Sequence, residues 1–108
     1  MISKTSSTFS QKVCALAKSI PQGRVTTYGL LTAAAGGHPM LSRMITSILS
    51  KDPETDLIPF HRIVYSDGRV WLEPKHHQHR LKLYAQEGIR LDSKNRIIDF
   101  EKLLFMFK

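Results

Sequence analysis

The pattern that most constrains the fold lies in residues 27–50, where a tight glycine turn joins two short helical segments. The first segment covers residues 28–35, follows Thr27 as a suitable N-cap and stops at Gly36-Gly37. The second begins at Pro39, a residue that suits the first turn of a helix, and runs to about residue 50. Two helices joined by a short turn that contains glycine are typical of a helix-turn-helix.

The second of these helical segments is amphipathic. Its apolar residues recur at helical spacing and are expected to face the core: Leu41, Met44, Ile45, Ile48 and Leu49. The opposite face holds one cation and three hydroxyls without a carboxylate: Arg43, Thr46, Ser47 and Ser50. That face suits contacts with phosphate groups, and it equally fits an ordinary solvated helix surface.

The other expected elements are short and surround this unit. Thr8 is a suitable N-cap for an earlier helix, and Asp67-Gly68 between β-rich runs predicts a hairpin that would form a wing. The tail from Glu101 is expected to pack on the body of the domain. The remaining predictions are helices over 8–20 and 76–87, a strand over 24–26, and hairpins that join 63–65 to 70–72 and 89–91 to 96–98.

The positive charge is concentrated in the N-terminal half. Six of the 16 Lys and Arg residues precede Asp52, and Asp52 is the first acidic residue of the chain. A half-domain of one sign suggests a polyanion such as nucleic acid, although a basic surface can also serve solubility alone. The single cysteine, Cys14, cannot form an internal disulfide, and no apolar run reaches membrane-spanning length. We therefore expect a cytoplasmic protein that does not bind membranes.

Several separated motifs resemble one family. Pro59-Phe60-His61-Arg62 is similar to the Pro-Cys-His-Arg active-site signature of O6-alkylguanine-DNA alkyltransferases, with phenylalanine in place of cysteine. Residues 20–29 resemble the segment of that family that leads into its recognition helix-turn-helix. Arg43 falls at the position of the intercalating arginine, and Glu87-Gly88 matches the end of the last helix. The resemblance spans about residues 9–91.

This resemblance implies an α/β fold, a winged helix-turn-helix domain similar to the C-terminal domain of the alkyltransferases. It implies one domain over 1–108, with a core over about 9–91 and a short extension over 92–108. The nearest subgroup is the alkyltransferase-like proteins, which lack the cysteine, bind alkylated guanine and mark it for nucleotide excision repair. The implied partners of a monomeric protein are duplex DNA that contains alkylated guanine and nucleotide excision repair proteins.

The chemistry of the repair reaction explains why one substitution matters. Alkyl transfer from guanine O6 needs a thiolate, which a histidine deprotonates and a carboxylate orients. His61 and Glu87 still supply the base and its partner by resemblance, but Phe60 has no lone pair to accept an alkyl group. Cys14 lies within a predicted helix and lacks the flanking Pro and His-Arg residues of the signature. We expect it to be a buried apolar residue. The resemblance therefore implies binding without catalysis.

The same resemblance assigns the DNA contacts. Arg43 would fill the gap left by a flipped base, Tyr28 would rotate the 3′ phosphate, and Thr27, Thr46 and Ser47 would hold phosphates. The implied lesion pocket consists of Tyr28, Phe60, His61, Trp71 and Glu87. Each residue also has a structural interpretation: Tyr28 and Phe60 as core, Arg43 as one solvated arginine, Arg62 as a link between loops, and His61 with Glu87 as a brace.

Two departures from the family leave more than one function open. Thr46 and Ser47 replace smaller residues, often glycine, and Trp71-Leu72-Glu73-Pro74 replaces a small polar run. The second change favours a winged-helix DNA-binding module without lesion specificity. An enzyme that uses His61 and Glu87 for acid–base chemistry and a protein-interaction domain are also compatible with the sequence. Residues 76–79 include three histidines but no further ligands at useful spacing, so we expect no metal and no cofactor.

Overall fold

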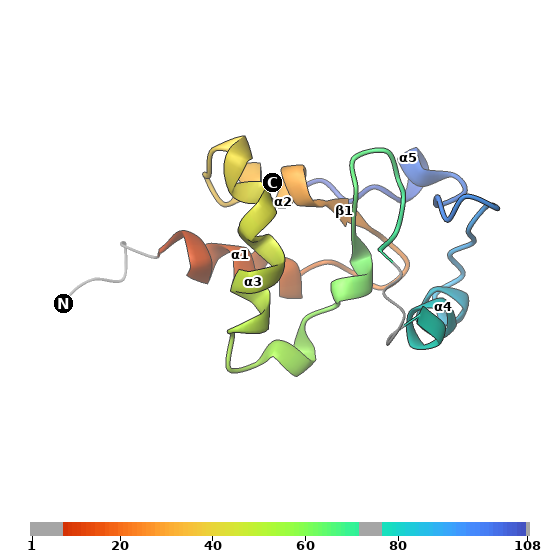
Figure 1. Ribbon diagram of the computed structural model, residues 1–108, viewed down its shortest axis with the longest axis horizontal. Helices are drawn as coiled ribbons and strands as arrows, with labels where there is room; N and C mark the ends of the chain where they lie inside the picture. The colour runs from red at the N-terminus through yellow and green to blue at the C-terminus, as the bar shows by residue number, and fades with distance from the viewer. Residues whose placement is uncertain (1–7, 72–76, 108) are drawn as a thin grey trace.

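The computed structural model describes residues 8–71 and 77–107 (Figure 1). No helix within these residues is long and apolar enough to cross a membrane. The elements follow one another in the order α1 (Phe9–Lys18), β1 (Thr26–Thr27), α2 (Tyr28–Ala34), 3-10 helix η1 (Pro39–Met44), α3 (Ile45–Ser50), 3-10 helices η2 (Thr55–Leu57) and η3 (Phe60–Arg62), β2 (Ile63–Val64), α4 (His77–Gln86) and α5 (Phe100–Leu103).

The first half of the chain folds into a group of helices around one core. Thr8 caps α1 as predicted, because its hydroxyl accepts from the Gln11 amide while the Gln11 side chain accepts from the Thr8 amide. α1 packs against α2 and α3. The buried residues of this core are Val13, Cys14, Ala17, Ile20, Leu31, Ala35, Ile45, Leu49, Ile58 and Ile63. Cys14 is only 7% exposed, which confirms the prediction that it is buried.

The glycine turn between α2 and η1 packs against the start of α1. Gly36 ends α2 with a φ of +82°, a left-handed conformation that glycine adopts without a steric penalty. A Cβ on the next residue, Gly37, would lie 2.4 Å from Cε1 of Phe9. Gly36 therefore supplies the left-handed backbone and Gly37 the close approach to Phe9, and the predicted helix-turn-helix is present.

The second helix of this unit differs from the prediction of one continuous helix. Residues 39–44 form the 3-10 helix η1, and only residues 45–50 form the α-helix α3. Because a 3-10 helix rotates further per residue than an α-helix, Met44 leaves the apolar stripe and is 48% exposed. Two side-chain contacts hold this tighter turn: His38 accepts from the Met40 amide, and the Ser42 hydroxyl donates to Thr32.

A small parallel sheet joins the helices to the second half of the chain. Thr26 and Thr27 of β1 pair with Ile63 and Val64 of β2, so the first strand begins two residues later and ends one residue later than the predicted strand over 24–26. Val25 pairs in parallel with Leu104 on the other side. This pairing confirms that the C-terminal tail packs on the body (Figure 1).

A second core lies under the hairpin segment, α4 and the C-terminal residues. Its buried members are Val25, Val64, Val70, Tyr84, Ile89 and Ile97. The predicted turn at Asp67-Gly68 forms, with the Gly68 amide donating to the Tyr65 carbonyl over 2.9 Å. The returning strand was predicted wrongly. Only the Tyr65 amide pairs back, donating to the Arg69 carbonyl over 3.0 Å, whereas Val70 donates to Asn95 and Arg69 forms an antiparallel bridge with Arg96. Leu72 lies outside the described residues.

The last predicted elements form with small differences. α4 begins at His77 and its end is closed by Gly88, while His76 lies outside the described residues. The second hairpin forms as a short antiparallel pairing of Leu91 with Ile97, in which the Ile98 amide donates to the Arg90 carbonyl over 2.8 Å. α4 packs against η3, the 3-10 helix just before β2 (Figure 1).

Candidate nucleic-acid interface

The polar face of the second helix of the unit is at the surface. Arg43 at the end of η1 and Ser47 in α3 are exposed, and Thr46 is half-buried. Within the described residues, Arg43 makes no ion pair. Ser50 is exposed, but its hydroxyl donates to the Thr46 carbonyl over 2.8 Å. The face therefore offers a free guanidinium and hydroxyl groups, as phosphate binding requires.

Thr27 does not belong to this exposed face. Its side chain accepts from the Leu30 amide over 3.0 Å and the residue is only 6% exposed. The hydroxyl caps α2, as predicted, because the first amides of a helix lack partners within the helix. The phosphate contact of Thr27 stays a prediction, since a hydroxyl that accepts one hydrogen bond can still donate another.

A hollow of about 520 Å³ lies beside Arg43. We call it the tyrosine hollow; it is lined by Tyr28, Ser42, Arg43, Thr46, Tyr65 and Trp71. The Tyr28 and Tyr65 ring centroids are 5.7 Å apart, with the rings tilted by 44°. Small-molecule sites occupy about 300–1,000 Å³ and are lined mainly by apolar and aromatic groups. Aromatic rings around such a space could stack on a nucleobase.

A second hollow, of about 850 Å³, lies between the end of α3, the segment 55–62 and α4. We call it the phenylalanine hollow; among its lining residues are Asp56, Ile58, Phe60, His61, Arg62, His79, Arg80 and Leu83. Phe60 also packs against the helical core, so its ring is partly core and partly hollow lining, and its role in a lesion pocket stays a prediction. The same is true of Tyr28, which packs on that core and lines the tyrosine hollow.

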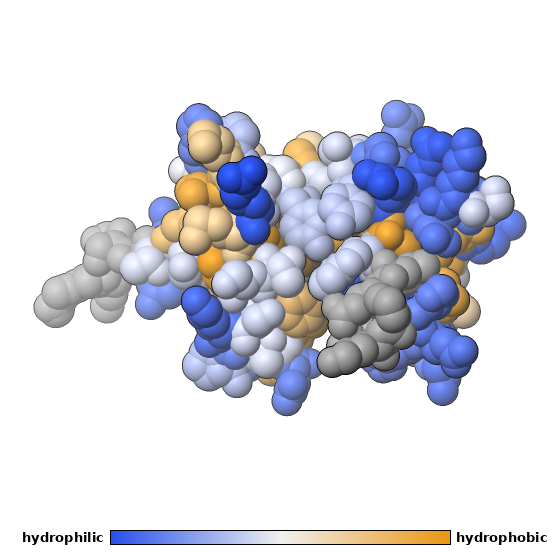
Figure 2. All heavy atoms as spheres, viewed as in Figure 1, coloured by the Kyte–Doolittle hydropathy of each residue, from blue (hydrophilic) through white to orange (hydrophobic). Residues whose placement is uncertain are grey.

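The predicted lesion pocket is therefore divided between two hollows. Tyr28 and Trp71 line one, whereas Phe60 and His61 line the other. Glu87 lines neither of them, because its carboxylate turns into a buried network. Figure 2 shows one face of the molecule, where blue hydrophilic side chains gather mainly at the right and lower margins and pale and orange ones lie between them.

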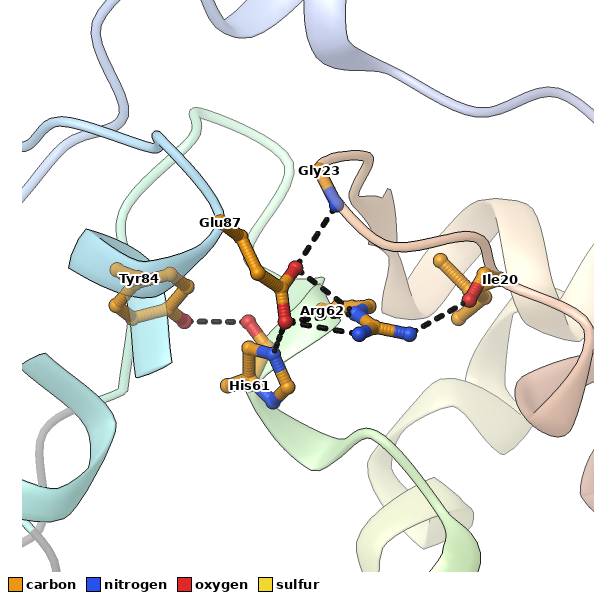
Figure 3. A network of polar contacts seen from close by, with 6 residues as sticks. All are labelled: Ile20, Gly23, His61, Arg62, Tyr84 and Glu87. Atoms are coloured by element: carbon orange, nitrogen blue, oxygen red, sulfur yellow. Dashed lines mark hydrogen bonds and ion pairs between the residues drawn. The ribbon is translucent and has the colours of Figure 1, made fainter. Parts of the chain in front are cut away.

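Glu87 is the centre of that network (Figure 3). Its Oε2 lies 2.6 Å from Nε2 of His61 and accepts from Nη2 of Arg62 over 2.8 Å. Its Oε1 accepts from Nε of Arg62 and from the Gly23 amide. Nη1 of Arg62 donates to the Ile20 carbonyl, and the Tyr84 hydroxyl donates to the His61 carbonyl. Arg62 thus links separate segments, as its structural interpretation predicted.

The network fixes the protonation of its members. Burial raises the pKa of Glu87, but hydrogen bonds from Arg62, Gly23 and His61 outweigh this effect and lower it to about 2. Burial lowers the pKa of His61, and the neighbouring Glu87 offsets that change only in part. An ionised Glu87 can only accept, so the neutral His61 carries its proton on Nε2. The free lone pair then lies on Nδ1.

The described residues also include two site residues that the sequence did not single out. Tyr65 stacks near Tyr28, and its ring lies 5.2 Å from the Arg69 guanidinium carbon. Arg80 lines the phenylalanine hollow and lies 5.3 Å from the Trp71 ring centroid. Tyr65 looked like an ordinary strand residue and Arg80 like one cation on a polar helix. Whether these two side chains reach the hollows depends on how α4 packs against residues 60–71, and no local sequence pattern predicts that packing.

The histidine-rich segment has no metal-site geometry in the part of the chain that is described. There, no group of three or more His, Cys, Asp or Glu side chains is placed to hold a metal ion. His79 instead lines the phenylalanine hollow from α4. His76 lies outside the described ranges.

Comparisons with known proteins agree with this architecture. The sequence matches the family described as "6-O-methylguanine DNA methyltransferase, DNA binding domain" over residues 8–89. It is 32% identical over 89 residues to the DNA base-flipping protein of Escherichia coli (strain K12), which covers 82% of this chain and 68% of that protein. It is also 32% identical over 84 residues to a methylated-DNA–protein-cysteine methyltransferase of Methanothermobacter thermautotrophicus, covering 78% of this chain and 46% of that one.

The fold has a solved counterpart. The crystal structure of S. pombe Atl1 in complex with damaged DNA containing O6-carboxymethylguanine matches with a TM-score of 0.69 and 26% identity, covering 93% of this chain and 94% of that one. The predicted fold class and family are thereby confirmed. The chain belongs to the family of 6-O-methylguanine DNA methyltransferase DNA-binding domains.

Proposed function

We propose that this protein binds alkylated guanine in duplex DNA, flips the damaged base out of the helix and holds it without removing the alkyl group. The complex would then mark the lesion for nucleotide excision repair. The relatives named DNA base-flipping protein and Atl1 bound to damaged DNA support the binding step. The absence of transfer rests on a residue of this chain.

That residue is Phe60. It stands between Pro59 and the buried His61–Glu87 pair, where the resemblance places the cysteine of the alkyltransferases. The base and its orienting carboxylate are 2.6 Å apart, yet the residue before them carries only an aromatic ring. Such a ring can contact a base or an alkyl group but cannot accept the alkyl group covalently. This observation carries the proposal.

The residues to which we assign flipping lie around the tyrosine hollow. Arg43 is exposed at one edge and can enter the duplex in place of the flipped base. Tyr28, Tyr65 and Trp71 surround the space that would receive the base. Stacking on aromatic rings is worth about 1–3 kcal/mol per base, which offsets the few kcal/mol needed to unstack the nucleotide.

Cys14 is not a second candidate for the acceptor, and we expect it to be inert. Burial, aided by the neighbouring Asp52 carboxylate, raises the pKa of its thiol to about 11. At pH 8 the native protein should react with a disulfide reagent such as DTNB at least about a hundredfold more slowly than the unfolded protein in urea, because the thiolate is scarce and buried. Rapid labelling of the native protein would show that this thiol is accessible.

The proposal is tested by looking for transfer under conditions that favour it. Purified protein is incubated with excess duplex that contains O6-methylguanine, and intact-protein mass and the digested DNA bases are both measured. We expect an unmodified protein and an intact methylated base. A methyl increment on the protein, or loss of the methyl group from the DNA, would refute binding without transfer.

The same experiment tests for an enzyme that uses His61 and Glu87 in acid–base chemistry. The network explains these two residues as a brace that joins residues 20, 23, 62 and 84, without any need for a reaction. A base that is hydrolysed or deaminated in the digest would favour an enzyme instead. A DNA-binding module without lesion specificity would differ in another measurement, because it would bind damaged and undamaged duplexes equally.

A further inference from the structure

Arg80 occupies the boundary between the two hollows. It lines the phenylalanine hollow, and its guanidinium carbon lies 5.3 Å from the ring centroid of Trp71, which lines the tyrosine hollow. Its charge also acts on Tyr28 in one hollow and on His61 in the other. Ser50, which also lines the phenylalanine hollow, donates to the Thr46 carbonyl on the tyrosine-hollow side, but Arg80 is the residue whose described contact brings a cation between the two spaces.

The Arg80 side chain is held in place but its charge is not matched by its described contacts. Nη1 donates to the Trp71 carbonyl over 3.3 Å, and that acceptor is neutral. The contrast with Arg62 is informative, because Arg62 binds the ionised Glu87 through three hydrogen bonds. Both arginines line the phenylalanine hollow, yet only Arg80 brings a cation there whose described partners are a carbonyl and an aromatic ring.

The remaining charges around the phenylalanine hollow leave it suited to an anion on the α4 side. His79 lies next to Arg80 on α4, and Asp56 is the carboxylate among the described lining residues. Asp56 is exposed and belongs to η2, a different element from α4. Ile58 and Phe60 form an apolar lining. An occupant with an apolar stem and a negative end would match both features.

We propose that Arg80 is a specificity-determining residue that selects O6-alkyl groups ending in a carboxylate over neutral groups of the same shape. The inference rests on the proposed function: the flipped guanine occupies the tyrosine hollow and its O6 substituent passes Arg80 towards Phe60. The guanidinium then donates a charge-assisted hydrogen bond to the carboxylate. Trp71 orients Arg80 through the contact between its ring and the guanidinium.

The test uses a pair of adducts that differ in charge but hardly in shape. Duplexes of one sequence carry guanine, O6-carbamoylmethylguanine or O6-carboxymethylguanine, and binding is followed by fluorescence anisotropy. A partly exposed charge-assisted bond predicts that the carboxylate is bound about fivefold more tightly than the amide. Equal affinity for the two adducts would overturn the assignment of Arg80.

Variants separate the charge of Arg80 from its packing. In Arg80→Gln the preference for the carboxylate should fall to within about twofold, whereas Arg80→Lys should keep part of it because the charge remains. Lys82→Gln is the matched control, since it removes the same charge from an exposed site on α4 that lines neither hollow. Asp56→Asn should increase the preference. A preference retained in Arg80→Gln would contradict the proposal.

The three duplexes also distinguish this inference from the proposed function. If the amide adduct binds no better than normal guanine, lesion recognition itself fails. If the amide adduct binds better than guanine but the carboxylate gains nothing further, only the role of Arg80 fails. Circular dichroism of each variant excludes loss of folding as the cause of a changed ratio.

Discussion

Replacement of Glu87 by glutamine is expected to lower the free energy of unfolding by about 3 kcal/mol, since breaking a buried ion pair typically costs about this much. The Glu87 side chain is 5% exposed and accepts from Arg62, His61 and Gly23 at once. In Glu87→Gln the Arg62 guanidinium loses its counterion, although its side chain is only 18% exposed. Urea unfolding at neutral pH, followed by circular dichroism, measures the change.

The same network predicts how stability depends on pH. The pKa of Glu87 is lowered from 4.5 to about 2, so the folded state binds fewer protons than the unfolded state between these values. This contribution is complete above about pH 4.5 and is lost as the pH falls towards 2. His61 acts in the same direction from a higher pH, because its pKa is lowered from 6.5 in the folded protein. Stability should therefore decline on acidification, and in Glu87→Gln the part of the decline below about pH 4.5 should be lost.

Glu101→Gln is the matched control for this prediction. Glu101 is an exposed residue of α5 with no described ion pair, so its loss of charge should change the free energy of unfolding by less than about 0.5 kcal/mol. If Glu87→Gln were as stable as Glu101→Gln and had an unchanged acid profile, the network would not be the brace that Figure 3 shows.

Replacement of Arg43 by alanine is expected to weaken binding to an O6-methylguanine duplex by at least about tenfold, or about 1.4 kcal/mol. Arg43 is exposed at the edge of the tyrosine hollow, where it would fill the gap left by the flipped base. Binding to undamaged duplex, which keeps its bases stacked, should fall less. Anisotropy titrations of both duplexes at one salt concentration measure the two changes.

Lys12→Ala controls for the general loss of positive charge. Lys12 is an exposed residue of α1 and lines neither hollow. Its removal lowers the net charge by the same amount and should weaken both duplexes slightly and equally. Equal losses in Arg43→Ala and Lys12→Ala would show that Arg43 contributes only charge.

Local sequence signals predicted those parts of the fold that depend on neighbouring residues. The Thr8 and Thr27 caps, the glycine turn and the Asp67-Gly68 turn each follow from hydrogen bonds or backbone conformations within a few residues. The pairing of β2 with β1 was missed, because it brings together residues about 37 positions apart (Thr26 with Ile63). A turn signal identifies where the chain reverses but not which strand it will join.

For the candidate site too, the sequence identified individual residues but not the arrangement that depends on packing. The resemblance named Phe60, His61 and Glu87, and the structure joins His61 and Glu87 directly. It could not show that Phe60 and Tyr28 line separate hollows, because this depends on how the segment 55–62 and α4 pack. Thr27 was assigned both to the cap of α2 and to a phosphate; the structure shows the cap, and the phosphate contact stays a prediction.

The most direct test of lesion recognition is a titration of two matched duplexes, one with O6-methylguanine and one with normal guanine, at one moderate salt concentration. Fluorescence anisotropy gives both dissociation constants for the unmodified protein. We predict a preference of at least about tenfold for the methylated duplex, about 1.4 kcal/mol. Equal affinity for both duplexes would contradict lesion recognition and identify a winged-helix module that binds DNA without reading the damage.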